Sequence, residues 1–155
     1  MQKLRLFLKS FSNAICGLII CAKNERNFRI HIVACAYVSA LAALYGLSKT
    51  ECAVLVFVMS MVFISEMLNT AVETIVDIKA ESYNALAKMA KDIAAGAVLV
   101  SAFASVITAA LLFGDIKKLG DTVSLFANPL YLIPFVISIV ISVLFINMNA
   151  KGRKN

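Results

Sequence analysis

Four long, mostly apolar stretches divide the chain, and each can form a helix that crosses a membrane. They cover residues 30–47, 52–78, 93–114 and 130–148. A helix needs about 20 predominantly apolar residues to cross the hydrocarbon of a bilayer. Acidic residues, the first of them Glu66, interrupt the second half of the second stretch. As one helix this stretch would be about 40 Å long and would project beyond the hydrocarbon. The pattern predicts four membrane spans.

The segment before the first span has a different, one-sided pattern. Its apolar residues recur at helical spacing: Leu4, Phe7, Leu8, Phe11, Ile15, Leu18 and Ala22. Polar residues such as Arg5 and Lys9 lie away from this stripe, which predicts a helix on the membrane surface. A secretory signal peptide is the competing interpretation of the basic start. However, the apolar run is short, lacks a small-residue cleavage site and leads directly into charged residues.

The basic residues predict the orientation of the spans. With the N-terminus in the cytoplasm, 12 of the 15 Lys and Arg residues lie inside and three lie outside, namely Lys49, Lys117 and Lys118. Cytoplasmic loops of membrane proteins carry such an excess. Both termini are therefore predicted to be cytoplasmic. The long connection at residues 114–129 is predicted to be an external loop.

Composition supports this class of protein. Of the 155 residues, 61% are hydrophobic and only 15% are charged, and the mean hydropathy is +0.89. These values exclude a disordered chain and argue against an ordinary soluble domain. The net charge of +6 comes from short clusters between apolar runs, which suits anionic lipid and predicts no nucleic-acid partner. The four cysteines lack metal-ligand spacing and are predicted to be free thiols.

A polar stripe runs along the second span. At about 100° per residue, Glu66, Asn69, Glu73 and Asp77 share an arc of about 80°. Glu66 would lie roughly 21 Å into a hydrocarbon core of about 30 Å. An ionised acid there costs a few kcal/mol or more, so it needs a partner or a function. A protonated Glu66 that bonds a neighbouring helix is the simpler alternative.

Further charged residues are predicted at the same level of the membrane as this polar stripe. Lys91 and Asp92 follow a predicted loop at residues 79–90, and Glu25 precedes the first span. Separately, such residues are often a helix cap and a lysine that reaches toward water. Together with the stripe they supply carboxylates for Mg²⁺, a cation for phosphate and a carboxylate base, as phosphoryl transfer requires. The chain has neither a P-loop nor the motifs of protein kinases, so ATP chemistry would need another architecture.

Three motifs resemble the small prokaryotic integral-membrane diacylglycerol kinases and undecaprenol kinases. They are N-E-R-N-F-R at 24–29, E-M-L-N-T-A-V-E-T-I-V-D at 66–77 and A-K-D-I-A-A-G at 90–96. The resemblance implies a surface helix and three spans, assembled as a homotrimer with active sites at subunit boundaries near the cytoplasmic face. Residues 1–114 would then form the lipid kinase domain. Residues 115–155 would add the external loop, a fourth span and a basic cytoplasmic tail.

The resemblance also implies roles for individual residues. Glu66 corresponds to the catalytic base that takes the proton from the lipid hydroxyl, and Glu25 and Glu73 to the carboxylates that hold the metal of MgATP. The other residues implied in nucleotide binding are Asn13, Asn69, Asp77, Ser82, Tyr83, Asn84, Lys91 and Asp92. Family members often have Glu-Tyr-His where this chain has Ser82, Tyr83 and Asn84, and here Glu81 stands one place early.

The sequence thus predicts an all-α membrane protein of the cell membrane that phosphorylates a lipid alcohol with ATP and Mg²⁺ by direct in-line transfer. Undecaprenol is the preferred acceptor, because residues 25–31 and 91–97 resemble the undecaprenol kinases, and diacylglycerol is the alternative. A small proton-coupled transporter is the alternative from another class, although such proteins carry their buried acid in the first span. In the additional span, the spacing of Ser138 and Ser142 indicates helix packing.

Overall fold

The computed structural model describes residues 2–79 and 84–148, and every regular element within these ranges is helical. The elements are α1 (Gln2–Asn24), α2 (Arg26–Tyr45), α3 (Lys49–Lys79), α4 (Ala85–Leu112), α5 (Ile116–Ser124), the 3-10 turn η1 (Leu125–Ala127) and α6 (Pro129–Ile146). The predicted all-α architecture is confirmed. The four predicted spans correspond to α2, α3, α4 and α6.

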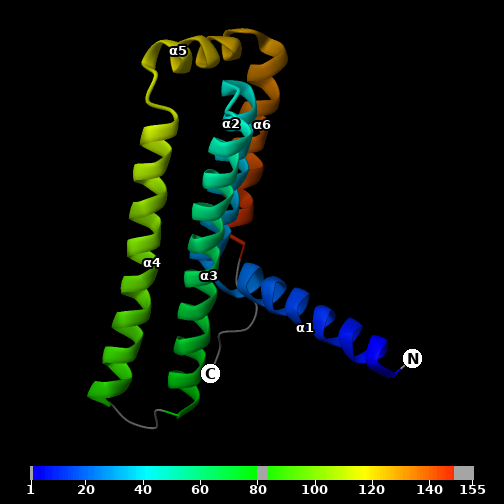
Figure 1. The fold of residues 1–155 in the computed structure, drawn as a ribbon, viewed down its shortest axis with the longest axis vertical. Helices are drawn as coiled ribbons and strands as arrows, with labels where there is room; N and C mark the ends of the chain where they lie inside the picture. The colour runs from blue at the N-terminus through cyan, green and yellow to red at the C-terminus, as the bar shows by residue number, and fades with distance from the viewer. Residues whose placement is uncertain (1, 80–83, 149–155) are drawn as a thin grey trace.

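The long helices take two different courses. Helices α2, α3, α4 and α6 run alongside one another, whereas α1 leaves the bundle sideways (Figure 1). By length and composition five helices could cross a membrane, and α1 is among them. Its oblique course in Figure 1 is nevertheless the one expected of a helix that lies on the membrane surface. Helix α5 crosses the end of the bundle opposite the last turn of α3 and the first turn of α4 (Figure 1).

Capping residues account for the tight turn between α2 and α3. Helix α2 is followed by Gly46 at φ +71°, a left-handed conformation that glycine adopts without steric cost. Ser48 and Glu51 then close a capping box. The Glu51 N–H donates to Ser48 Oγ at 3.3 Å, and the Ser48 N–H donates to Glu51 Oε2 at 2.7 Å. The short turn lets α2 pack back against α3.

The predicted loop at residues 79–90 is partly helical, so the prediction was wrong for its second half. Helix α4 begins at Ala85, because Asn84 Oδ1 accepts hydrogen bonds from the N–H groups of Leu86 at 2.9 Å and Ala87 at 3.3 Å. This N-cap satisfies backbone donors that a helix start otherwise leaves unpaired. Lys91 and Asp92 therefore lie in the second turn of α4.

The predicted external loop at residues 114–129 was also wrong in part, since it contains α5 and η1. Asp115 caps α5 by accepting from the Lys118 N–H at 3.0 Å. The Lys118 ammonium lies 4.3 Å from the centre of the Tyr45 ring at the end of α2. A cap and a tertiary contact thus stabilise a helix in a segment whose composition is typical of a loop.

The helices bury few side chains among themselves. The most extensive contact joins α3 and α4, and α2 packs against α3 with the Phe28 and Phe63 rings 5.3 Å apart. Large apolar side chains cover the outer faces, for example Phe57 at 66% exposure and Leu111 at 78%. Such faces are expected where lipid or another membrane helix replaces water.

The additional helix α6 packs against α2 through a polar ladder. The Tyr37 hydroxyl lies 3.0 Å from Ser138 Oγ and 3.2 Å from Ser142 Oγ, and the Tyr37 and Phe135 rings are 5.9 Å apart. Ser138 also donates to the Phe135 carbonyl, which leaves its oxygen to accept from Tyr37 while Ser142 donates. The packing role predicted for the two serines is confirmed.

Replacing Tyr37 with Phe is expected to loosen α6 without changing the fold. The substitution removes both hydroxyl contacts but keeps the ring, so the free energy of unfolding should fall by about 1 kcal/mol. Unfolding in a denaturing detergent, followed by circular dichroism, measures this change. Tyr131→Phe, which alters an exposed tyrosine of α6, is the matched control and should unfold as the unsubstituted protein does. Equal stability of the two variants would contradict the role of the ladder.

Candidate active site

The predicted stripe on α3 forms one face of the helix. Glu66 is its most buried member, with 3% of its surface exposed. Two turns further on, Glu73 accepts a hydrogen bond from Asn69 Nδ2 at 3.0 Å, and its charge acts on the Glu66 carboxyl. Asn69 Oδ1 is buried and is the one such side-chain atom in the described ranges without a hydrogen-bond partner. An unsatisfied buried acceptor is costly, so it marks a position where a ligand donor would be stabilising.

A sharp corner between α1 and α2 brings another carboxyl to the stripe. Glu25 alone joins the two helices and has an extended backbone, with φ −105° and ψ 118°. Its charge acts on Glu66, and Cys21 of α1 lies beside the Thr70 side chain of α3. Three elements therefore converge at Glu66.

Helix α4 contributes a cation to the end of the stripe. Lys91 Nζ donates to Asp77 Oδ1 at 2.8 Å, and this ion pair is partly exposed. Such a pair on the surface adds little stability, which leaves the lysine available to phosphate oxygens at little cost. The neighbouring Asp92 is exposed. The structure thus gathers Glu25, Glu66, Asn69, Glu73, Asp77 and Lys91 around adjoining turns of α3.

The carboxylates suit a divalent cation that arrives with a nucleotide. Within residues 2–79 and 84–148, no group of three or more His, Cys, Asp or Glu side chains could hold a metal by itself. However, Mg²⁺ is usually bound by one or two carboxylates, several waters and the phosphates of its substrate. The charges of Glu25 and Glu73 both act on Glu66, and a cation between the carboxylates would relieve that repulsion. The donor set therefore fits MgATP better than a resident metal.

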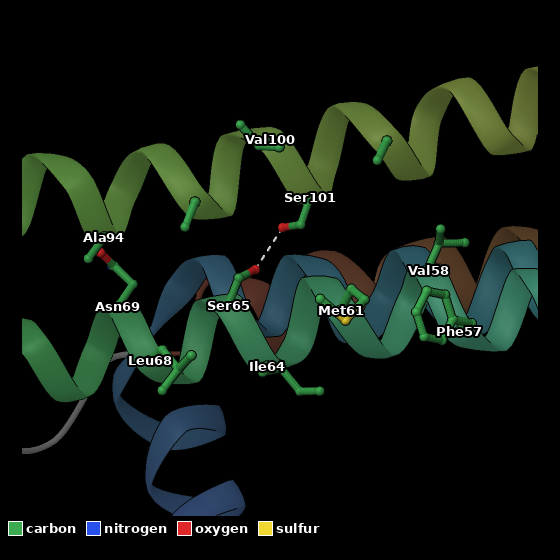
Figure 2. Close-up of a pocket in the computed structure, with 12 residues that line it drawn as sticks. Phe57, Val58, Met61, Ile64, Ser65, Leu68, Asn69, Ala94, Val100 and Ser101 are labelled. Carbon is green, nitrogen blue, oxygen red and sulfur yellow. Dashed lines mark hydrogen bonds between the residues drawn. The ribbon is translucent and has the colours of Figure 1, made fainter.

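Two apolar grooves flank the stripe. One of about 560 Å³ lies between α3 and α4 and reaches from Phe57 to Asn69. Figure 2 shows Asn69 directed from α3 toward Ala94 of α4, next to the Ser65–Ser101 hydrogen bond of 2.7 Å. The other, of about 520 Å³, lies between the end of α1 and the α2–α3 pair. Their linings are almost wholly apolar, so they suit hydrocarbon chains rather than soluble substrates.

Some predicted site residues are not brought to Glu66 within this chain. Asn13 is exposed on α1, about 18 Å along the helix axis from Glu25. Asn84 caps α4 through its side-chain oxygen. Ser82 and Tyr83 lie outside the described residues.

Sequence reasoning missed the buried Arg29, which is 4% exposed and donates to backbone carbonyls at the end of α1, at the end of α6 and just beyond α6. It also missed the contact of Cys21 with Thr70 beside Glu66. The available signal for Arg29 was its position four residues after Glu25, one helical turn away. No sequence pattern pointed to its partners, because two of them are more than 100 residues away.

The fold and the site together define a class of protein: an all-α integral membrane protein with a carboxylate site flanked by apolar grooves. A sequence model of the prokaryotic diacylglycerol kinases matches residues 12–113, and the chain belongs to this family. The family consists of lipid kinases, which are phosphotransferases with an alcohol acceptor. Helices α5 and α6 lie outside the matched residues.

Two curated proteins are similar to this chain. A protein of Synechocystis named diacylglycerol kinase is 46% identical over 101 residues, which are 64% of this chain and 58% of that protein. A protein of Bacillus subtilis named undecaprenol kinase is 40% identical over 112 residues, which are 72% of this chain and 91% of that protein. The match thus spans less than two thirds of the first relative and most of the second. No solved structure matches the chain.

Proposed function

We propose that the protein is an ATP-dependent lipid kinase that transfers the γ-phosphoryl group of MgATP to the hydroxyl of a membrane lipid alcohol. The observation that carries the proposal is the burial of Glu66, at 3% exposure, between the charges of Glu25 and Glu73 and beside apolar grooves. A buried base next to a cation-binding site and a hydrocarbon groove is the combination that phosphorylation of a lipid needs.

Glu66 acts as the general base and takes the proton from the lipid hydroxyl. Glu25 and Glu73 hold the magnesium ion that MgATP brings. Asn69 orients Glu73 through their 3.0 Å hydrogen bond. The bound magnesium neutralises charge on the phosphates, and this chain's own residues align the acceptor with the donor.

The remaining nucleotide contacts belong to the same proposal. Lys91 turns from Asp77 toward phosphate oxygens when the nucleotide binds, at the modest cost of one partly exposed ion pair. The other proposed nucleotide contacts are Asn13, Asp77, Ser82, Tyr83, Asn84 and Asp92. Transfer is direct and in line, with no covalent intermediate on the enzyme.

Undecaprenol is the preferred acceptor, and diacylglycerol is the alternative. Each relative has a name that fits one of these lipids, but the match to the protein named undecaprenol kinase covers 91% of that protein, against 58% for the other. The acyl or prenyl chain lies in an apolar groove beside α3, which leaves the hydroxyl near Glu66.

The proposal includes an arrangement in the cell membrane. Both termini face the cytoplasm, α1 lies on the inner surface, and ATP reaches the site from that side. The kinase domain comprises residues 1–114, and residues 115–155 add α5, α6 and the basic tail. The protein acts as a homotrimer.

A competition assay tests the proposal. The purified full chain receives labelled ATP, Mg²⁺ and equal mole fractions of undecaprenol and diacylglycerol in detergent, and labelled lipids are separated by chromatography. We expect phosphorylated undecaprenol to be the main product. A main product of phosphatidic acid would favour the alternative acceptor. Absence of any labelled lipid, together with proton-coupled uptake by vesicles, would favour a small proton-coupled transporter instead.

A further inference from the structure

We infer that Arg29 is a positioning residue through which the end of the additional helix α6 fixes Glu25, and thereby the binding of MgATP. The inference rests on the proposed role of Glu25 in holding magnesium. It goes beyond that role, because it gives a function in nucleotide binding to a helix that lies outside residues 12–113.

Arg29 joins the ends of two helices. Its Nη1 donates to the carbonyls of Ala22 at 3.1 Å and Lys23 at 3.0 Å, at the end of α1. Its Nε donates to the carbonyl of Ile146, the last residue of α6, at 3.1 Å, and its Nη2 donates to that of Met148, two residues further on, at 3.1 Å. The last carbonyls of a helix lack partners within the helix and carry partial negative charge. One planar guanidinium satisfies three such carbonyls and that of Met148, just beyond α6, which a lysine ammonium cannot do with the same geometry.

The same arginine determines the corner that carries Glu25. Arg29 belongs to α2, and its side chain holds the last carbonyls of α1, so it sets the direction of one helix relative to the other. Within the corner, the Glu25 N–H donates to Cys21 O at 2.8 Å and the Arg29 N–H donates to Glu25 O at 3.3 Å. The Glu25 backbone is thus bonded on both sides. Movement of either helix would displace its carboxyl from Glu66.

Helix α6 restrains α2, because it is attached to α2 at two points. It is attached near its middle through Tyr37 and at its end through Arg29, which is 4% exposed. Without α6 to place the carbonyls of Ile146 and Met148, two of the arginine's four bonds would be lost, and the buried cation would have to find other acceptors at a cost. The rigidity of the corner therefore depends on α6 as well as on α1.

Steady-state kinetics of the full chain test the inference. For Arg29→Gln we expect the KM for MgATP to rise about tenfold, while the KM for the lipid alcohol stays within about twofold. Excess Mg²⁺ should restore part of the loss, because a misplaced carboxylate still binds the ion weakly. Arg29→Lys should lie between Arg29→Gln and the unsubstituted protein. Arg26→Gln, which removes an exposed positive charge from the same corner, is the matched control and should leave both KM values unchanged.

Hydrogen exchange gives a readout that does not depend on activity. In Arg29→Gln, amides in residues 22–28 and in residues 143–148 should exchange faster together, because one side chain holds both segments. An unchanged KM for MgATP would overturn the inference, as would an equal rise in Arg26→Gln. Faster exchange at residues 22–28 alone would show that α6 does not take part in positioning Glu25. If Arg29→Gln does not fold, Arg29→Lys decides the question by the same criteria. An unsubstituted protein that phosphorylates neither lipid would refute the proposed function. Hydrogen exchange would still test whether Arg29 holds the ends of α1 and α6 together.

Discussion

Replacing Glu66 with Gln is expected to lower the rate of lipid phosphorylation by about 1,000-fold. Gln has nearly the same size as Glu and can fill the same buried position, but it cannot accept the proton of the lipid hydroxyl. Affinity for MgATP should change little, because Glu66 is not one of the two carboxylates proposed to hold the magnesium ion. Single-turnover phosphorylation and binding of a fluorescent ATP analogue, measured on the same preparation, separate the two effects.

Glu51→Gln is the matched control for this experiment. It makes the same change on the same helix, but in the first turn of α3, where Glu51 takes part in a cap. We expect nearly full activity from this variant. A Glu66→Gln protein that turns over as fast as the control would exclude Glu66 as the base and leave it a role in packing.

The second large effect is expected for Glu73→Gln, which should lower kcat/KM for MgATP by at least about 100-fold. Removing a group that only hydrogen-bonds to a metal ligand already lowers metal affinity or activity by about 10- to 100-fold, and Glu73 is proposed to be a ligand itself. The Gln carbonyl can still accept the hydrogen bond from Asn69 Nδ2, so the local structure should be kept while the charge is lost. Activity as a function of total Mg²⁺ measures the effect, and the midpoint should move to higher concentration.

Asp121→Asn provides a charge control for Glu73→Gln, since Asp121 is an exposed acid of α5 at the other end of the bundle. Its Mg²⁺ midpoint should equal that of the unsubstituted protein. If Glu73→Gln shares this midpoint, the magnesium ion is held elsewhere, and Glu73 would serve only to orient Asn69.

Local sequence patterns were sufficient to predict the long helices and the polar stripe. Hydrophobic length determines where a span can lie, and the helical repeat alone places Glu66, Asn69 and Glu73 on one face. The hydrogen bond between Asn69 and Glu73 follows from their separation of four residues. These features depend on residues close together in the chain.

Features that depend on distant contacts could not be predicted in the same way. Helix α5 has the composition of a loop, and its stability includes the contact of Lys118 with Tyr45 on another helix. The four hydrogen bonds of Arg29 involve main-chain carbonyls. Every residue type carries such a carbonyl, so no pattern of side chains predicts these bonds. The approach of Glu25 to Glu66 likewise depends on the angle between α1 and α2, which tertiary packing sets.

The attachment of α6 has a steric consequence for contacts between copies of the chain. The strip of α2 around Tyr37 is already occupied by the protein's own last helix. A neighbouring copy therefore cannot dock on that strip without displacing α6. The apolar outer faces of α1, α3 and α4 stay exposed, and so does the outer face of α6, for example Ile141 at 60% and Leu144 at 66%. On this side of the bundle, a neighbouring copy would therefore meet the aliphatic outer face of α6 instead of the strip around Tyr37.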